Sequence, residues 1–104
     1  MKNYIVVFIT VSSKKESKKI TEYLIKNKLA ACVNEIPNIS STYWWKEKIE
    51  KSKELLLVIK TKKSVLNKLI KEVKKIHSYS VPEVIALPII DGNKDYLDWI
   101  NSSI

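Results

Sequence analysis

The chain has 104 residues, of which 45% are hydrophobic, and this length and composition predict one globular domain spanning residues 1–104 and exclude disorder. Its formal net charge is +8, all nineteen basic residues are lysines, and cysteine and histidine each occur once. One cysteine and one histidine exclude an internal disulfide, a CxxC motif and a soft four-ligand metal site built by one chain alone.

The N-terminal part predicts a strand followed by a helix. Residues 3–11 are β-branched and aromatic without polar alternation, which is typical of a strand buried on both faces. Ser13 and Glu16 have the spacing of a capping box. A helix is therefore expected from about Lys14 to Asn27, with its lysines facing water.

The middle of the chain predicts further strands. Ala30–Ile36 is the second strand, and Pro37 indicates a bend or bulge because proline lacks a donor for the sheet. Ile39–Trp45 continues in extended form, and the polar run 46–53 is expected to be a turn. Glu54–Thr61 is a continuous apolar strand.

The C-terminal part predicts a helix, a strand and a second helix. Ser64–Ile76 has an apolar stripe at helical spacing. Pro82 fixes its own φ and disfavours helix at the residue before it, so this helix must end first. Val84–Ile90 then reads as a strand, and Asn93 caps a short last helix.

The element order is β-α-β-β-α-β plus a C-terminal helix, which is the α+β, ferredoxin-like pattern with a single antiparallel sheet. Right-handed crossovers would place both long helices on the same sheet face. Because the strands are apolar on both faces, we expect copies of the chain to cover the second face. The Tyr43-Trp44-Trp45 segment is expected to project from the core and contact a neighbouring copy.

Four side chains are candidates for chemistry, each with a structural alternative. His77 is either a C-terminal helix cap or a metal ligand or proton acceptor at a subunit junction. Cys32 is either a small buried hydrophobic residue or a metal ligand. Glu83 leads into an apolar strand, and Lys60 is its expected partner, in a structural pair or beside a ligand cleft.

Several function classes are disfavoured by residues that are absent. Gly92 is the only glycine, which excludes phosphate-binding and dinucleotide-binding glycine loops and the glycine-aromatic signature of RNA-recognition modules. Acylphosphatase-type chemistry would need an arginine, and no nucleophile elbow surrounds a serine. We therefore expect no enzymatic activity.

Charge and hydropathy give the expected location and exclude some partners. The lysines are spread over helices and turns with acids between them, and arginine, which makes most bidentate contacts to guanine and phosphate, is absent. We therefore expect a solvated surface and no nucleic-acid partner. No apolar run reaches the roughly 18–20 residues that span a bilayer, and no signal-peptide cleavage site is evident, so we expect a cytoplasmic protein without a membrane partner.

The chain resembles the CutA family of divalent-cation tolerance proteins along its whole length. The matching segments are Leu29-Ala30-Ala31-Cys32-Val33-Asn34, Tyr43-Trp44-Trp45, Glu54, Leu57-Val58-Ile59-Lys60-Thr61, His77-x-Tyr79-x-Val81-Pro82-Glu83-Val84-Ile85-Ala86-Leu87-Pro88-Ile89, Gly92-Asn93 and Tyr96-Leu97-x-Trp99-Ile100. The resemblance implies a ferredoxin-like fold and a tight homotrimer whose architecture is similar to nitrogen-regulatory PII proteins. It also implies a role in tolerance of copper and other divalent metals.

The resemblance suggests a metal site that differs from that of copper-binding members. In those members the ligands are a first-strand cysteine and a histidine pair, whereas here the first strand has no sulfur and Ile76 precedes His77. We expect His77, Glu83 and Cys32 to bind a borderline or hard divalent ion such as Cu²⁺ or Zn²⁺, without a firmly bound cofactor. The alternative is a PII-like sensor or interaction module that takes a small anion or a protein partner at its subunit clefts. The residues expected in a cleft or interface are Tyr43, Trp44, Trp45, Glu54, Lys60, Tyr79 and Trp99.

Overall fold

The computed structural model describes residues 3–104 as four strands, three α-helices and one short 3-10 turn. The elements in chain order are β1 (Tyr4–Val11), α1 (Lys14–Lys26), β2 (Cys32–Trp45), β3 (Lys48–Lys62), the 3-10 turn (Lys63–Val65), α2 (Leu66–Ile76), β4 (Val84–Pro88) and α3 (Lys94–Ser103). This order confirms the predicted β-α-β-β-α-β arrangement with a C-terminal helix.

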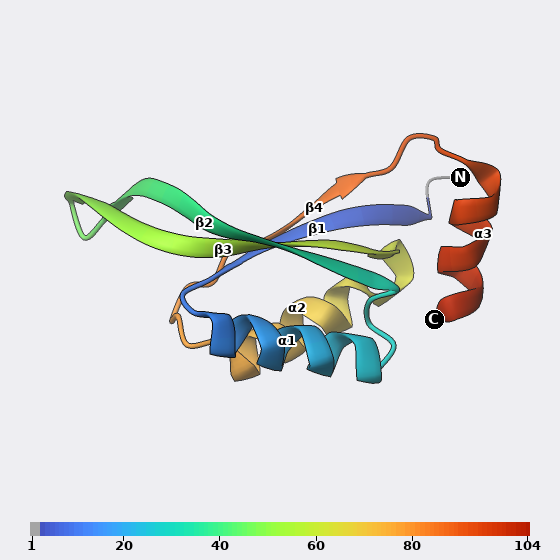
Figure 1. Cartoon of the computed structure of the whole chain (residues 1–104), viewed down its shortest axis with the longest axis horizontal. Coiled ribbons are helices and arrows are strands. Elements are labelled where there is room, and N and C mark those ends of the chain that lie inside the picture. The colour runs from blue at the N-terminus through green and yellow to red at the C-terminus, as the bar shows by residue number, and fades with distance from the viewer. Residues whose placement is uncertain (1–2) are drawn as a thin grey trace.

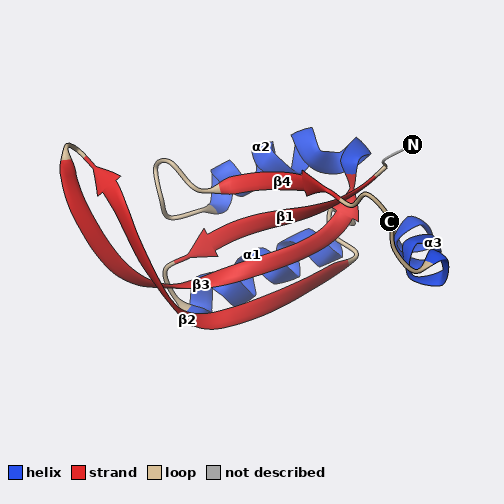
Figure 2. Cartoon of the chain, turned by 90° about the horizontal axis from the view of Figure 1, so that it is seen from above, coloured by secondary structure: helices blue, strands red, loops and turns tan. Residues whose placement is uncertain are grey.

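The four strands form one antiparallel sheet in the order β2-β3-β1-β4, which can be followed across Figure 2. Both α1 and α2 lie below this sheet in Figure 1, as the handedness of the crossovers predicts. The two central strands are β1 and β3, whose eight paired positions run from Tyr4 opposite Lys62 to Val11 opposite Leu55. The fold is therefore the predicted ferredoxin-like one.

The core fills the space between the sheet and the two long helices. Alternate residues of β1 and β3 point toward the helices and are almost fully buried, as the two-residue period of a strand requires. Matching apolar residues from α1 and α2 complete the layer. The largest members of this core are Ile9, Ile20, Leu24, Leu57, Ile59 and Leu69.

The opposite face of the sheet is apolar and has no helix over it (Figure 1). The strand register places Val6, Phe8 and Val58 on this face, and the same register adds Ile85 and Leu87 from β4. Ile85 is 51% exposed and Leu87 is 44% exposed, which is unusual for aliphatic residues on a sheet. The prediction that the strands are apolar on both faces is confirmed, and we call this surface the open sheet face.

Strands β2 and β3 continue past the body as a long twisted hairpin, here called the arm (residues 38–53), at the left of Figure 1. The predicted turn over residues 46–53 is wrong, because the strands pair as far as Trp45 opposite Lys48 and only Lys46 and Glu47 lie between them. The register shift between Ile36 and Ile39 confirms the bulge that Pro37 predicts.

Helix α1 starts as expected, although its capping box is incomplete. The Ser13 side chain accepts a hydrogen bond from the Glu16 amide at 3.1 Å, which caps the helix. Glu16 does not return to the Ser13 amide; its carboxylate accepts from the Ser12 amide at 3.3 Å and from the Ser78 amide at 2.6 Å. This carboxylate therefore links the start of α1 to the segment that follows α2.

One smaller difference concerns the C-terminal part. Strand β4 ends at Pro88, so the predicted extent to Ile90 is two residues too long. Asn93 caps α3 through its side-chain oxygen, which accepts from the Asp95 amide at 2.9 Å, as expected. Within residues 3–104 no helix is long and apolar enough to cross a membrane.

Candidate functional site

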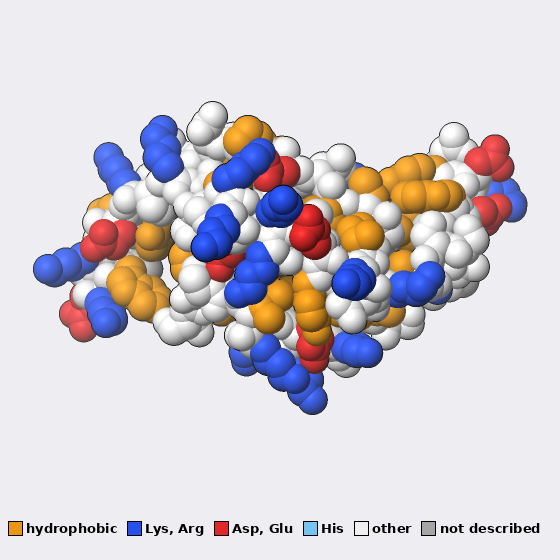
Figure 3. All heavy atoms as spheres, turned by 60° about the horizontal axis from the view of Figure 1, so that its bottom comes forward, with side chains coloured by type: hydrophobic (Ala, Val, Ile, Leu, Met, Phe, Trp, Pro, Cys, Tyr) orange, Lys and Arg blue, Asp and Glu red, His pale blue; other side chains and the backbone are white. Residues whose placement is uncertain are grey.

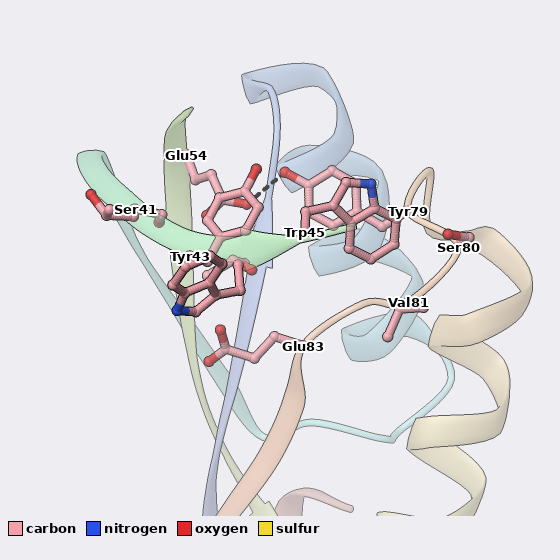
Figure 4. A pocket seen from close by; sticks show the side chains of 11 residues that line it. Ser41, Tyr43, Trp45, Glu54, Tyr79, Ser80, Val81 and Glu83 are labelled. Atoms are coloured by element: carbon pink, nitrogen blue, oxygen red, sulfur yellow. Dashed lines mark hydrogen bonds between the residues drawn. The ribbon is translucent and has the colours of Figure 1, made fainter. Parts of the chain in front are cut away.

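A cavity of about 780 Å³ lies between residues 41–45 of the arm and the segment between α2 and β4. One wall comes from Tyr43 and Trp45 of β2, and Glu54 of β3 forms its inner end. Tyr79 and Glu83, from the segment between α2 and β4, complete the lining (Figure 4). The cavity therefore brings together residues far apart in the chain, and five of the seven predicted cleft residues line it: Tyr43, Trp44, Trp45, Glu54 and Tyr79.

The innermost polar contact of the cavity joins Tyr79 to Glu54. The Tyr79 hydroxyl donates to the Glu54 carboxylate at 2.5 Å, the dashed line in Figure 4. Glu54 is only 6% exposed although it is an acid on a strand. Burial of the ring and the adjacent Glu54 carboxylate raise the pKa of Tyr79 above its ordinary range. The phenol therefore keeps its proton and acts as a donor.

Glu83 brings a second carboxylate to the cavity, at its open side. Partial burial raises the pKa of Glu83 above the ordinary value, and the nearby charge of Glu54 raises it further. No described lysine forms an ion pair with either carboxylate. The cavity therefore has an excess of negative charge that a cation would relieve.

His77 does not face the cavity as a free ligand. Its ring is buried, with Nδ1 accepting from the Tyr79 amide at 3.0 Å and Nε2 lying 2.8 Å from the Thr10 carbonyl oxygen. Because the Tyr79 amide donates to Nδ1, the proton resides on Nε2, which donates to Thr10. Both nitrogens of a neutral imidazole are thus occupied, and the ring holds the backbone at Tyr79 in place.

Glu16 fixes the same segment from the other side. Its carboxylate accepts from both the amide and the hydroxyl of Ser78, at 2.6 and 3.0 Å. Burial opposes ionisation of this group, but the hydrogen bonds from Ser78 and Ser12 outweigh it and lower the pKa of Glu16. Tyr79 is therefore placed between two anchored neighbours, His77 and Ser78, and its hydroxyl is directed at Glu54.

The other predicted site residues lie elsewhere. Lys60 is on the open sheet face, where it pairs with Cys32 in register and donates to the Asn34 side chain. The expected Lys60–Glu83 pair is therefore wrong, because Glu83 faces Glu54. Trp99 belongs to α3 and packs against Tyr96, with ring centroids 5.4 Å apart.

The three predicted metal ligands are not brought together within one chain. His77 is turned toward Thr10, Glu83 lines the cavity, and Cys32 begins β2 on the open sheet face. Among residues 3–104 no cluster of three or more His, Cys, Asp or Glu side chains is arranged to hold a metal ion. A metal site that uses all three would need more than a single chain in this conformation.

Sequence reasoning missed two parts of the site. Glu16 was interpreted only as a helix cap, although it anchors Ser78, which is 62 residues away. Ser41 and Thr42 add hydroxyl groups to the cavity wall. Because side chains alternate between the two faces of a strand, Ser41 lies on the same side of β2 as Tyr43, and this spacing could have indicated that Ser41 belongs to the site.

The comparisons with known proteins agree with this architecture. Residues 5–103 match the family described as CutA1 divalent ion tolerance protein. The chain belongs to this family. A divalent-cation tolerance protein CutA from Thermus thermophilus is 44% identical over 98 residues, which cover 94% of this chain and 95% of the relative.

Other CutA relatives are longer than this chain. Protein CutA 1, chloroplastic, from Oryza sativa is 50% identical over 99 residues, and the match spans 95% of this chain but 56% of the relative. The chain likewise matches 54% of a chloroplastic CutA protein from Arabidopsis thaliana. The chain thus spans about half the length of these two plant relatives.

Solved CutA structures share the fold closely. The crystal structure of CutA1 from Oryza sativa superposes with a TM-score of 0.94 at 50% sequence identity, covering 97% of this chain and 93% of that one. A structure described as the periplasmic divalent cation tolerance protein CutA from Archaeoglobus fulgidus gives a TM-score of 0.93 at 40% identity, covering 96% and 97%. Relatives are thus described from more than one compartment, and the cytoplasmic location stays a prediction.

Proposed function

We propose that the chain is a non-enzymatic divalent-cation tolerance protein that works as a homotrimer and binds a divalent cation at the cavity beside Glu54 and Glu83. Family membership supports the tolerance role, since several relatives are described by that term. The observation that carries the cation proposal is the pair of carboxylates that share the cavity without a neutralising lysine.

The electrostatics favour a divalent ion over an empty cavity. Burial raises the pKa of Glu83, and repulsion between the two carboxylates that share this partly desolvated space raises it further. A dication neutralises both charges and would lower that pKa again. Cation binding should therefore release protons and should weaken as the pH falls and Glu83 becomes protonated.

The donor set indicates which ions suit the cavity. The groups available are carboxylates from Glu54 and Glu83 and hydroxyls from Ser41 and Thr42, all of which are oxygen donors. Oxygen donors suit hard and borderline divalent ions such as Mn²⁺ and Zn²⁺ better than Cu⁺. Two carboxylates leave coordination positions for water or for a residue of a neighbouring copy.

His77 has a positioning role in this proposal. Its ring fixes the Tyr79 backbone, and the Tyr79 hydroxyl in turn orients the Glu54 carboxylate. Such outer hydrogen bonds adjust a ligand without contacting the ion. The alternative, in which His77 is itself a ligand together with Glu83 and Cys32, requires the His77 ring to leave Thr10 and is tested by the same experiment.

Calorimetric titration of Zn²⁺, Mn²⁺ and Cu²⁺ into the metal-free protein tests the proposal. Glu83→Gln should weaken binding by roughly tenfold or more, because it removes a charged ligand. Glu22→Gln makes the same charge change on the exposed outer side of α1 and should leave the affinity within about twofold. Equal affinities for the wild type and Glu83→Gln would remove the cavity as the cation site.

A His77→Ala titration separates the two ligand sets. If His77 is a ligand, the variant should lose binding as completely as Glu83→Gln does. If it only positions Tyr79, the variant should lose clearly less affinity than Glu83→Gln does. Circular dichroism of the variant checks that the loss does not come from unfolding.

A second candidate function is a PII-like sensor or an interaction module. The observation that favours it is the aromatic wall of the cavity, where Trp44 is 71% exposed and Trp45 is 42% exposed. A cavity of about 780 Å³ has the size of a small-molecule site. A thermal-shift screen with nucleotides and small carboxylates tests this version, and the absence of any shift at saturating concentration counts against it.

A further inference from the structure

The net positive charge of the chain is confined to one layer of the fold. Residues 14–28 and 63–76, which comprise α1, α2 and their flanks, contain eleven lysines and three glutamates. Their balance of +8 equals the net charge of the whole chain. The remaining residues contain eight lysines and eight acids and are neutral overall. We call the outer surface of this helical layer the lysine face.

Two of the three glutamates in this layer are held by hydrogen bonds within the fold, and only one of these two contacts a lysine. Glu16 is buried and accepts from Ser12 and Ser78. The Glu72 carboxylate accepts from the Tyr23 hydroxyl at 2.5 Å and from Lys75 at 3.3 Å. Only Glu22 remains exposed without such a contact among the described residues. The carboxylates therefore do little to neutralise the surface charge.

Most lysines of this layer are correspondingly unpaired. Lys14 pairs with Glu35, and Lys75 pairs with Glu72. The other nine form no ion pair with any carboxylate in the described part of the chain: Lys15, Lys18, Lys19, Lys26, Lys28, Lys63, Lys68, Lys71 and Lys74. Figure 3, which turns the helix-covered side toward the viewer, shows lysine side chains spread over this face with few acids between them.

We propose that the lysine face binds the phosphate backbone of double-stranded nucleic acid without sequence preference. Helix α1, with 13 residues, is about 20 Å long and so runs beside about six phosphates of one strand. Lysine ammonium groups bind phosphates as point charges, and they need no arginine to do so. The absence of arginine, which led us to expect no nucleic-acid partner, removes the commonest side chain for base readout but leaves backbone binding open.

The composition of the face favours a duplex over single strands or a membrane. Single-strand binding relies on exposed aromatic rings that stack with bases. The only aromatic residue of this layer is Tyr23, which is partly buried and whose hydroxyl is bound to Glu72. Membrane binding relies on apolar side chains that enter the lipid, and among the large hydrophobic residues of the layer only Ile25 is exposed, at 44%.

This inference does not rest on the proposed cation function. The lysine face lies on the helix-covered side of the sheet, whereas the open sheet face is the one that neighbouring copies would cover (Figure 1). Assembly would therefore leave the lysine face exposed and would multiply its charge. The carboxylate cavity is lined by the arm and residues 79–83 and includes no residue of α1 or α2.

Fluorescence anisotropy with a labelled 20-base-pair DNA duplex tests the proposal on the full chain, with EDTA present to exclude divalent ions. The wild type should bind at 25–50 mM KCl, and its affinity should fall steeply between 50 and 200 mM KCl. A second duplex of different sequence should bind within about twofold, because phosphates carry no sequence information.

A matched pair of triple variants locates the surface. On the lysine face the changes are Lys18→Gln, Lys71→Gln and Lys74→Gln, all at exposed positions. On the arm they are Lys46→Gln, Lys48→Gln and Lys51→Gln, which remove the same charge. The first variant should weaken binding at 50 mM KCl by roughly tenfold or more and reduce the salt slope by about 2 to 3, at about 0.9 per lost contact. The arm variant should stay within about threefold.

The opposite results would overturn the proposal. Equal losses of affinity in both variants would mean that only the total charge matters. Wild-type binding that does not depend on salt, or no binding at 25 mM KCl, would remove nucleic acid as the partner.

Sedimentation with vesicles of phosphatidylserine and phosphatidylcholine provides a further comparison. Binding to these vesicles without binding to the duplex would assign the face to a membrane. Thermal melting of both variants checks that they are folded, and loss of duplex binding would leave the cation titrations unaffected.

Discussion

Hydrogen bonds from the end of β1 and the start of α1, and one from the adjacent Tyr79 amide, hold the residue pair His77–Ser78 at the end of α2. The His77 ring contacts the Thr10 carbonyl and the Tyr79 amide, and Ser78 is held by Glu16. No side-chain nitrogen or oxygen that is fully buried in the described chain lacks a hydrogen-bond partner. Removing one member therefore leaves another buried group without its partner, which costs more free energy than the bond itself contributes.

Glu16→Gln should reveal this network through its pH dependence. The pKa of Glu16 is lowered in the folded chain, so ionised Glu16 stabilises the fold at pH values above its unfolded pKa of about 4.5. That contribution is lost as the pH falls through the lower, folded pKa. We expect the variant to be less stable by about 1–3 kcal/mol at pH 7, with the difference shrinking toward pH 3.

Urea unfolding at fixed protein concentration, at pH 7, 5 and 3, measures this difference. The Glu22→Gln variant is the control, because Glu22 is exposed on the same helix. A constant difference between wild type and Glu16→Gln across the pH range would contradict the ionised hydrogen-bond network.

The arm is the element that depends most on local backbone geometry. Its two-residue turn holds Lys46 at φ 51° and Glu47 at φ 65°, a conformation that asparagine and glycine adopt more readily than lysine and glutamate. Changing Lys46→Asn together with Glu47→Gly should therefore stabilise the hairpin by about 1 kcal/mol.

The same residue types at extended positions provide the control for this prediction. Lys48→Asn with Glu50→Gly lies within β3 and should destabilise the chain, since glycine and asparagine disfavour strands. Urea unfolding of both double variants and the wild type measures the effects. A loss of stability in the turn variant would show that the positive φ angles at Lys46 and Glu47 do not reduce the stability of the hairpin.

Strands and helices were predictable where the apolar pattern was strong. The continuous apolar runs of β1 and of residues 54–61, and the stripe along α2, gave elements close to those observed. The first part of β3 was missed because residues 48–53 contain a single apolar residue, Ile49. That stretch is a strand because it pairs with residues 40–45 of β2, and periodicity along one segment cannot reveal such a partner.

The sequence predicted several residues that line the cavity, but it did not predict how they contact one another. Tyr43, Trp45, Glu54, Tyr79 and Glu83 were expected at a cleft or a metal site, and the cavity brings these five together. Which side chains would contact each other was not predictable: Lys60 lies in β3 opposite Cys32, whereas Glu83 precedes β4 and is near Glu54. The role of the His77 ring likewise depends on a carbonyl 67 residues away.

At the scale of the whole molecule, the two sides of the sheet have opposite characters. The helix-covered side presents lysines to solvent, while the open sheet face presents Ile36, Ile85 and Leu87. Soluble chains rarely leave such an apolar sheet face uncovered. A homotrimer would bury the apolar residues of the open sheet face and would leave the lysines exposed to water. This is the physical argument for the proposed assembly.

Ile85→Lys tests that assembly. Ile85 is 51% exposed in the single chain, so the substitution should leave the fold of one chain intact but place a charge in the proposed interface. Ile25→Lys is the matched control, since Ile25 is 44% exposed on α1, away from the open sheet face. In light scattering after size exclusion, the wild type and Ile25→Lys should show three times the 12.1 kDa chain mass. Ile85→Lys should dissociate at micromolar concentration.

Thermal unfolding of the same three proteins should show that stability depends on assembly. The unfolding temperature of the wild type should rise with protein concentration, because dissociation and unfolding are linked by mass action, whereas that of dissociated Ile85→Lys should be lower and independent of concentration. A wild-type mass of 12.1 kDa would contradict the trimer, and so would an Ile85→Lys variant that remains as associated as Ile25→Lys. In either case the open sheet face would have to be stable in water on its own, which its exposed isoleucines and leucine argue against.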